Sequence, residues 1–479
     1  MNVTAYPELA LYINGRWLGK EGRDASEVLD PATERPLGLL PHATDGDVDA
    51  ALQAAHAAFP AWRRTPPLQR ASILYGAART LRKRSEELSW IVTQELGKPL
   101  AESKVEVSKA AELFEWSAEE SRRIYGRIIP ARETGTRQMV IPEPVGPVAA
   151  FSGWNAPAIT PSRKIASALA AGCTVVIKPA EETPATALFL ARVLHDSGLP
   201  AGALNMVFGD PGRISERMLE SPLIRAVTFT GSTVIGAKVA QMAAAGLKRS
   251  VLELGGHAPV LVFGDVDPEA AATTLVQAKL RNAGQICTSP TRMLVHESVA
   301  ERFAKSMAEQ ARQWRVGPGM EDGVQMGPLA NARRLQAIQS MVEDGRQKGG
   351  KVLAGGQRIG TQGYFFQPTV MQTYDETWLA ANVEPFGPLA IIRTFSTFDQ
   401  AIAEANRLPF GLAAYVFTHD TRIATDATDA MESGTVCVNH CLHSLPETPF
   451  GGIKHSGMGK EGGVEGLMEF TQYKYITQR

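Results

Sequence analysis

The fold is decided by the stretch "GPVAAFSGWNAPAITPSRKIASALAAGCTVVIKP", residues 146–179. An apolar run opens it, a helical pattern follows from "PSRKIASALAAG", and a second apolar run closes it in "TVVIKP". Short apolar strands joined by helices long enough for a crossover are typical of a parallel, doubly wound sheet. The same alternation continues through "TPATALFLARVLHDSG", "LNMVFG", "IRAVTFTG", "TVIGAKVAQMAAAG" and "SVLELGG". The sequence therefore predicts an α/β fold.

A second α/β series begins near Pro259. It runs through "APVLVFG", "TRMLVHES", "KVLAGG", "LAIIRTF" and "AAYVFT". We expect two doubly wound domains, which suits a chain of 479 residues. The expected ranges are 1–124 and 145–254 for the first domain, 255–453 for the second, and 125–144 with 454–479 for a small β arm and the C-terminal segment.

Two strand-like segments stand apart from both series. They are "RETGTRQMVIPEP", residues 132–144, and "FTQYKYITQR", residues 470–479. Neither has an obvious local partner in the sequence. We therefore expect each to extend a sheet in another subunit. Upstream, residues 45–62 and 66–96 carry helical patterns, the second of which ends at Gly97 and Pro99.

The composition is that of an ordinary globular protein. Hydrophobic residues make up 44% of the chain, charged residues 21%, and the formal net charge is -1, so neither nucleic acid nor a membrane surface is an expected partner. The N-terminus has no signal-peptide pattern, and prolines interrupt the longest uncharged run, Pro144 to Ser162. The four cysteines are irregularly spaced, which favours a cytoplasmic location and predicts no metal site.

One of those cysteines, Cys287, lies in the polar stretch "RNAGQICTSP". The small and polar neighbours predict an accessible loop with free backbone amides, which makes Cys287 a candidate nucleophile. The alternative is an inert, buried thiol. Cys173 and Cys437 lie in apolar runs, where that alternative holds.

A carboxylate ends an apolar strand in "SVLELGGHAP", where Glu253 follows Val251 and Leu252. Burial there raises the pKa of a carboxyl group toward the range of a general base. The alternative is an ion pair with Arg249 or Lys248.

Other polar groups also follow strands. Asn155 in "SGWNAPA" offers a neutral amide that can stabilise an oxyanion, although a turn-forming asparagine is the alternative. Lys178 and Glu181 follow "TVVI", at the end of a strand where doubly wound sheets bind ligands. Gly231 and Gly236 bracket a strand-to-helix turn suited to a phosphate, but their spacing is not the usual dinucleotide fingerprint.

Taken in order, these segments resemble the aldehyde dehydrogenase superfamily. The resemblance extends from "YINGRWLGKEGRDASEVLDPATE" to "PFGGIKHSGMGKEGG". It implies that Cys287 is the nucleophile, that Glu253 is the base which hydrolyses a thioester, and that Asn155 holds the oxyanion. Glu461 in "GKEGG" matches a glutamate assigned to a proton relay. Coenzyme A-acylating relatives generally lack the residue at Glu253, so its presence favours release of a free acid.

The resemblance also implies a cofactor and an assembly. The first domain would bind NAD, the second would be catalytic, and the arm would join subunits into a homodimer or homotetramer. A carboxylate at the adenosine ribose repels a 2′-phosphate, so Glu181 favours NAD over NADP. The cofactor contacts implied are Trp154, Lys178, Glu181, Gly231, Ser232, Gly236, Leu254, Glu384 and Phe386.

The closest resemblance is to the succinate-semialdehyde dehydrogenase branch. Arg163, Arg281 and Ser444 match the residues with which those enzymes hold the distal carboxylate of the substrate. The alternative is that both arginines are surface or helix-packing residues. The sequence thus predicts oxidation of a short aldehyde with a distal carboxylate, such as succinate semialdehyde. Ala156 and the proline of "TPSRK" depart from close relatives and leave aromatic or longer aldehydes as the second possibility.

A different class of function uses the same thiol without a cofactor. His257 stands where many relatives have a lysine, and its proximity to Glu253 in the sequence allows a Cys287–His257 pair. Such a pair would make the chain a thiol esterase.

Overall fold

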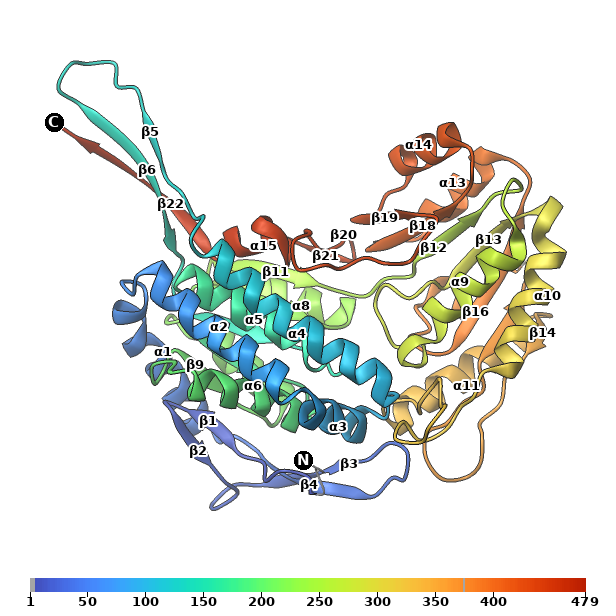
Figure 1. Cartoon of the computed structure of the whole chain (residues 1–479), viewed down its shortest axis with the longest axis horizontal. Coiled ribbons are helices and arrows are strands. Elements are labelled where there is room, and N and C mark those ends of the chain that lie inside the picture. The colour runs from blue at the N-terminus through green and yellow to red at the C-terminus, as the bar shows by residue number, and fades with distance from the viewer. Residues whose placement is uncertain (1–4, 374) are drawn as a thin grey trace.

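The computed structural model describes residues 5–373 and 375–479. Two large sheets flanked by helices form the body, and a small three-stranded sheet projects from it (Figure 1). The α/β class predicted from the sequence, with two doubly wound units and a β arm, is confirmed.

The first sheet has parallel strands at its centre and antiparallel strands at both edges. The four residues of both β7 and β8 are buried throughout, as expected for strands covered by helices on both faces. Its strands in spatial order are β2 (Arg16–Leu18), β1 (Leu11–Ile13), β9 (Leu204–Met206), β8 (Val175–Lys178), β7 (Val148–Phe151), β10 (Ala226–Thr230), β11 (Arg249–Glu253) and β21 (Gly457–Met458).

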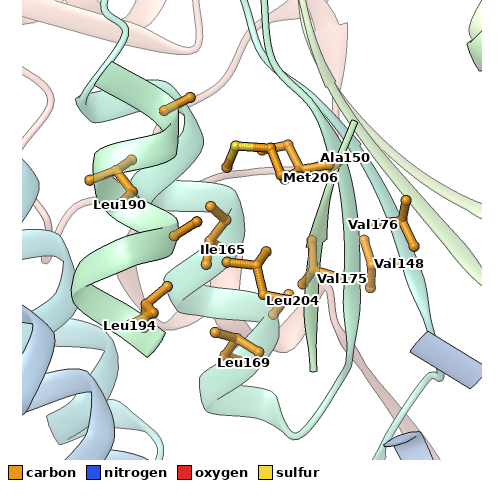
Figure 2. Packing of buried hydrophobic residues seen from close by; sticks show 14 of the residues in the cluster. Val148, Ala150, Ile165, Leu169, Val175, Val176, Leu190, Leu194, Leu204 and Met206 are labelled. Carbon is orange, nitrogen blue, oxygen red and sulfur yellow. The ribbon is translucent and has the colours of Figure 1, made fainter. Parts of the chain in front are cut away.

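Helices α5 (Ile159–Ala171) and α6 (Pro184–Asp196) pack on this sheet. Figure 2 shows Ile165 and Leu169 of α5 facing the apolar side chains of the strands, with Leu190 and Leu194 of α6 in the same buried cluster. Every residue of α5 from Pro161 onward is buried, because α4 (Leu100–Glu120) covers its other side. This close packing fixes the loop between β7 and α5.

The second sheet is parallel except for β14 at one edge. The stretch "KVLAGG" belongs to β14, so it does not continue the parallel series as expected. A short strand that the sequence pattern did not reveal, β15, lies between β14 and the rest. The order is β14 (Lys351–Ala354), β15 (Thr369–Gln372), β16 (Leu389–Phe395), β13 (Arg292–His296), β12 (Pro259–Val262), β18 (Ala413–Phe417) and β19 (Thr435–Val438).

The projecting arm contains the two strand-like segments that stand apart in the sequence. β6 (Arg137–Pro144) and β22 (Thr471–Gln478) are antiparallel partners within this chain, from the pair Pro144–Thr471 to the pair Arg137–Gln478. β5 (Arg127–Ile129) completes the sheet. Neither segment has a local partner in the sequence, because the fold brings together segments far apart in the chain. That each also extends a sheet in another subunit stays a prediction. Assembly into a dimer or tetramer stays a prediction.

The remaining elements cover the sheets. The helical pattern over 66–96 is interrupted at Arg84, whose φ of -105° ends one helix before the next begins. In the described part of the chain, no helix has both the length and the apolar content needed to span a bilayer. The other elements are β3 (Ala25–Leu29), β4 (Pro36–Pro41), α1 (Asp45–Trp62), α2 (Pro67–Lys83), α3 (Ser85–Leu96), α7 (Pro211–Glu220), α8 (Thr233–Ala245), α9 (Pro268–Leu280), the 3-10 turn η1 (Arg281–Gly284), α10 (Glu297–Gln313), α11 (Ala332–Gln347), α12 (Leu379–Asn382), α13 (Phe398–Asn406), β17 (Phe410–Gly411), α14 (Thr421–Ala430), β20 (Ile453–Lys454) and α15 (Gly463–Met468).

Candidate active site

The strand order of the first sheet creates a place for a ligand. Strands β7, β8 and β9 follow one another in one direction, whereas β10 and β11 lie on the opposite side of β7. Doubly wound sheets bind ligands at the carboxyl end of the strands where the order reverses. Asn155 follows β7, Gly231 follows β10, and Glu253 ends β11, so three of the predicted segments meet there.

A cavity of about 930 Å³ opens at this point between the two sheets. It brings together most of the residues singled out from the sequence, whereas Lys178, Glu181 and Gly236 lie outside its lining. The predicted residues that line it are Trp154, Asn155, Arg163, Gly231, Ser232, Glu253, Leu254, Arg281, Cys287, Glu384, Phe386, Ser444 and Glu461.

The loop before Cys287 is held in a conformation that few sequences adopt. Asn282, Ala283 and Gly284 have φ values of 50°, 53° and 72°, in the left-handed region. A Cβ on Gly284 would lie 2.1 Å from the carbonyl oxygen of Gly387, so this position requires glycine.

Hydrogen bonds to helix α4 and to the loop after β7 hold that strained loop. The backbone N–H of Asn282 donates to Glu102 Oε2 at 2.8 Å, and its Nδ2 donates to the carbonyl oxygen of Asn155 at 2.9 Å. On the other side, Gln285 Oε1 accepts from the backbone N–H of Ala330 at 2.9 Å. Strain that is over-determined in this way is typical of functional sites.

Cys287 is partly exposed in the cavity, as the polar loop predicted, whereas Cys173 and Cys437 are buried. Burial, followed by the charge of Glu253, raises the pKa of the Cys287 thiol well above its ordinary value. The group is therefore a thiol at neutral pH in the resting protein, and a neighbouring base must take its proton before it can act as a thiolate.

Glu253 is that neighbour, and only 3% of it is exposed. Burial, followed by the charge of Glu461, raises the pKa of Glu253 to about 7. Its Oε1 is buried with no hydrogen-bond partner among the described residues. A carboxyl group in this state can accept a proton near neutral pH.

The alternative of a structural ion pair for Glu253 is wrong. Arg249 Nη1 donates to the carbonyl oxygen of Glu469 at 3.0 Å. Lys248 Nζ donates to the carbonyl oxygen of Ser221 at 2.9 Å. Both cations are thus engaged elsewhere.

The side chain of Asn155 faces the nucleophile loop and does not close a local turn. Its Nδ2 donates to the carbonyl oxygen of Gln285 at 3.2 Å. The backbone carbonyl oxygen of Asn155 accepts from Lys98 Nζ at 3.3 Å. The amide donor therefore lies beside the loop that carries Cys287, in a position suited to a developing oxyanion.

Two buried lysines were not found from the sequence. Lys164 Nζ donates to Thr228 Oγ1 at 3.0 Å and forms an ion pair with Glu461. Lys98 forms an ion pair with Glu106, whose Oε1 accepts from the backbone N–H of Ala158. The sequence gives one sign that Lys164 is unusual. It lies in the helical stretch "KIASALAA", whose other residues are small or apolar, so this lysine has few solvent-facing neighbours.

The predicted adenosine contacts lie beyond the cavity. Lys178 ends β8 and forms an ion pair with Glu181 at 2.5 Å. Glu181 Oε1 also accepts from the backbone N–H of Gly209 at 3.2 Å. Gly236 lies inside α8 instead of ending the turn, and a Cβ there would lie 2.2 Å from Leu254 Cδ2. Close packing of α8 is therefore the reason for this glycine.

The remaining cofactor candidates fit a dinucleotide. Ser232 is the N-cap of α8, whose first amides face the cavity and suit a pyrophosphate. Phe386 has a φ of 44° and packs edge-on against Trp154, with ring centroids 5.4 Å apart. Burial raises the pKa of Glu384 to about 8, and hydrogen bonds from ribose hydroxyls would suit this carboxyl group.

The predicted substrate residues also lie together. Arg163, at the start of α5, is 4% exposed, and its Nη2 donates to Ser444 Oγ at 2.5 Å. The guanidinium carbon lies 4.7 Å from the centroid of the Phe450 ring. Arg281 lines the same cavity and forms no ion pair among the described residues, although its charge acts on Glu102. Burial excludes the surface half of the alternative for Arg163, and its role as a substrate contact stays a prediction.

His257 does not pair with Cys287. Its Nδ1 lies 2.7 Å from Thr291 Oγ1, and its Nε2 lies 3.0 Å from the carbonyl oxygen of Ala380. The imidazole is 2% exposed and does not line the cavity. The Cys287–His257 pair considered for an esterase is therefore not formed.

Comparison with known proteins agrees with this geometry. The chain is 39% identical to the NADP(+) succinate-semialdehyde dehydrogenase of Escherichia coli over 97% of this chain and 96% of that protein. It is 41% identical to the 4-(hydroxymethyl)benzenesulfonate dehydrogenase TsaD1 of Comamonas testosteroni over 99% of both chains. The crystal structure of succinate-semialdehyde dehydrogenase from Burkholderia pseudomallei superposes with a TM-score of 0.97 at 38% identity, and covers 100% of this chain and 99% of that one. Residues 17–476 match the aldehyde dehydrogenase family, and the chain belongs to that family.

Proposed function

We propose that this enzyme oxidises an aldehyde with a distal anionic group to its carboxylic acid, with NAD as the hydride acceptor. The observation that supports this most is the buried contact of Arg163 with Ser444 in the cavity that also holds Cys287 and Glu253. A buried guanidinium with no carboxylate partner is suited to an anionic substrate.

The residues divide the chemistry between them. Glu253 accepts the thiol proton, and the Cys287 thiolate attacks the aldehyde carbon to form a thiohemiacetal. The Asn155 amide and the Cys287 backbone N–H stabilise its oxyanion. When bound, the nicotinamide cofactor accepts the hydride that converts the thiohemiacetal into a thioester. Glu253 passes the thiol proton on, for which Glu461 with Lys164 offers a route, and the carboxylate is restored. It then takes a proton from a water molecule, whose attack on the thioester releases the free acid and the Cys287 sulfur.

Succinate semialdehyde is the best single candidate for the substrate, because two arginines and a hydroxyl can hold its carboxylate. We expect the wild-type enzyme to have a higher kcat/KM for succinate semialdehyde than for butanal or benzaldehyde. Arg163→Ala should lower the value for succinate semialdehyde by about 30-fold or more, since loss of one buried charged contact costs about 2–5 kcal/mol. Steady-state rates across the three aldehydes test this.

A matched control for that experiment is Arg213→Ala, since Arg213 is exposed, pairs with Asp45 and does not line the cavity. It should leave all three values unchanged. If an uncharged aldehyde is the best wild-type substrate, or if Arg163→Ala leaves the ranking as it was, the anion site is not formed as proposed.

An aromatic aldehyde is the second candidate. Ala156 lines the cavity beside Asn155, and its small side chain leaves room for a ring. The 4-(hydroxymethyl)benzenesulfonate dehydrogenase relative is as similar to this chain as the succinate-semialdehyde dehydrogenases are. A higher kcat/KM for 4-carboxybenzaldehyde than for succinate semialdehyde would favour this candidate.

The preference for NAD depends on Glu181. Its carboxylate would repel the 2′-phosphate of NADP, although the ion pair with Lys178 weakens this repulsion. We expect kcat/KM to be higher with NAD than with NADP, and Glu181→Gln to narrow the ratio. Equal values in the wild type, or an advantage for NADP, would overturn the assignment. A cytoplasmic location stays a prediction.

A further inference from the structure

One face of helix α4 lines the cavity with a residue that the proposed function does not use. Glu102, Val105, Glu106 and Lys109 recur at a spacing of three and four residues, and all four line the cavity. This places Lys109 in the same cavity as Arg163, Arg281 and Ser444.

Lys109 has no hydrogen bond or ion pair among the described residues. The acids on its own helix face are engaged elsewhere. Glu106 pairs with Lys98, and Glu102 accepts from the backbone N–H of Asn282 at 2.8 Å. Glu112, one turn further along, accepts from Ser108 Oγ at 3.2 Å, and its charge acts on Lys109 without a direct ion pair. The ammonium group of Lys109 is therefore available to a ligand.

Three cations from three elements act on this part of the cavity. They are Lys109 of α4, Arg163 of α5 and Arg281 of η1. His443, next to Ser444 in the chain, also lines the cavity. Burial lowers the pKa of His443 to about 4, and the charges of Arg281, Lys109 and Arg163 contribute to the shift. The imidazole is thus neutral at pH 7 and adds no positive charge to that of the three cations.

The geometry of His443 agrees with that neutral state. Its Nδ1 lies 3.0 Å from the carbonyl oxygen of Cys441, which can only accept, so Nδ1 carries the hydrogen. Its Nε2 therefore accepts from Thr288 Oγ1 at 2.6 Å. The histidine joins the loop of Ser444 to the residue after Cys287 and adds no charge of its own.

We propose that Lys109 is a third arm of the anion site, and that the site therefore accepts aldehydes with a terminal sulfonate as well as those with a carboxylate. This rests on the proposed function. A carboxylate presents two oxygens in a plane, which the guanidinium groups can hold. A sulfonate presents three oxygens in a tetrahedral arrangement, and the ammonium group of Lys109 supplies a donor for the third.

The test compares three aldehydes with the same three-carbon reach, namely succinate semialdehyde, 3-sulfopropanal and butanal. In the wild type we expect 3-sulfopropanal to have a kcat/KM at least equal to that of succinate semialdehyde. Lys109→Met should lower the value for 3-sulfopropanal by about 10-fold or more through KM, and that for succinate semialdehyde by about 3-fold or less. Butanal should be unaffected, and Lys109→Arg should retain most of the sulfonate activity.

The matched control is Lys104→Met, because Lys104 lies on the same helix, is exposed and pairs with Glu86 outside the cavity. It should change none of the three values. An equal loss for both anions in Lys109→Met, no loss for either, or poor turnover of 3-sulfopropanal in the wild type would each overturn the inference. Butanal as the best wild-type substrate would instead refute the proposed function, so the two failures are distinguishable.

Discussion

Cys287→Ala is expected to lower aldehyde oxidation by about 10⁴-fold or more, because the covalent route is lost with the nucleophile. Cofactor affinity should stay within about 3-fold of the wild type, since the thiol contributes chemistry and not dinucleotide contacts. Steady-state rates give the first quantity. Quenching of protein fluorescence on titration with NAD gives the second, helped by Trp154 in the cavity.

Cys441→Ala is the control for this result. Cys441 is the other partly exposed cysteine, and it does not line the cavity. This variant should keep wild-type turnover. Dehydrogenase activity close to wild type in Cys287→Ala would show that the reaction does not pass through this thiol.

Glu253→Gln is expected to separate the two halves of the reaction. Amide nitrogen and oxygen cannot take a proton from water, so hydrolysis of the thioester should slow by about 10²- to 10⁴-fold. Rapid mixing should show a burst of reduced cofactor, close to one per active site, followed by a slow steady state. The burst itself should also be slower than in the wild type if Glu253 takes the thiol proton first.

The pH dependence gives an independent measure of the same group. Burial raises the pKa of Glu253 to about 7, and the base is the deprotonated carboxylate. Wild-type turnover limited by hydrolysis should therefore rise as pH increases through about 7 and level off above it. Glu253→Gln should not show this rise. If Glu253→Gln turns over as fast as the wild type and shows no burst, another group is the base.

Local patterns identified residues that meet in one cavity because most of these groups follow strand ends. Cys287, Asn155 and Glu253 each lie next to a recognisable strand or polar loop, and a doubly wound sheet brings such ends together. The sequence also predicted the burial of Glu253, because a carboxylate that ends an apolar strand lies among buried residues. The burial of Glu253 and the exposure of Cys287 in the cavity bear this out.

Contacts between distant segments could not be predicted in the same way. Strands β6 and β22 pair across more than three hundred residues of intervening chain, and nothing in either segment names the other. Lys98 and Lys164 are ordinary residues in helical patterns, and only the fold shows that both are buried with a carboxylate. Lys109 could not be identified from the sequence either, because only the fold shows that its face of α4 lines the cavity.

The interpretation of Gly236 shows a further limit. Its position after a strand suggested a phosphate turn, but the structure places it within α8 against Leu254. A glycine required for close helix packing and one required for ligand approach look alike in a sequence. Only the position of the neighbouring side chain separates the two.

The central claim is that oxidation proceeds through an acyl group on Cys287 that Glu253 releases. The most direct measurement is mass spectrometry of peptides from Glu253→Gln, quenched within the burst after mixing with NAD and succinate semialdehyde. We predict that the peptide containing Cys287 gains the mass of the succinyl group, and that Cys173, Cys437 and Cys441 stay unmodified. Formation of reduced cofactor with an unmodified Cys287 peptide, or an acyl group on another cysteine, would contradict the account.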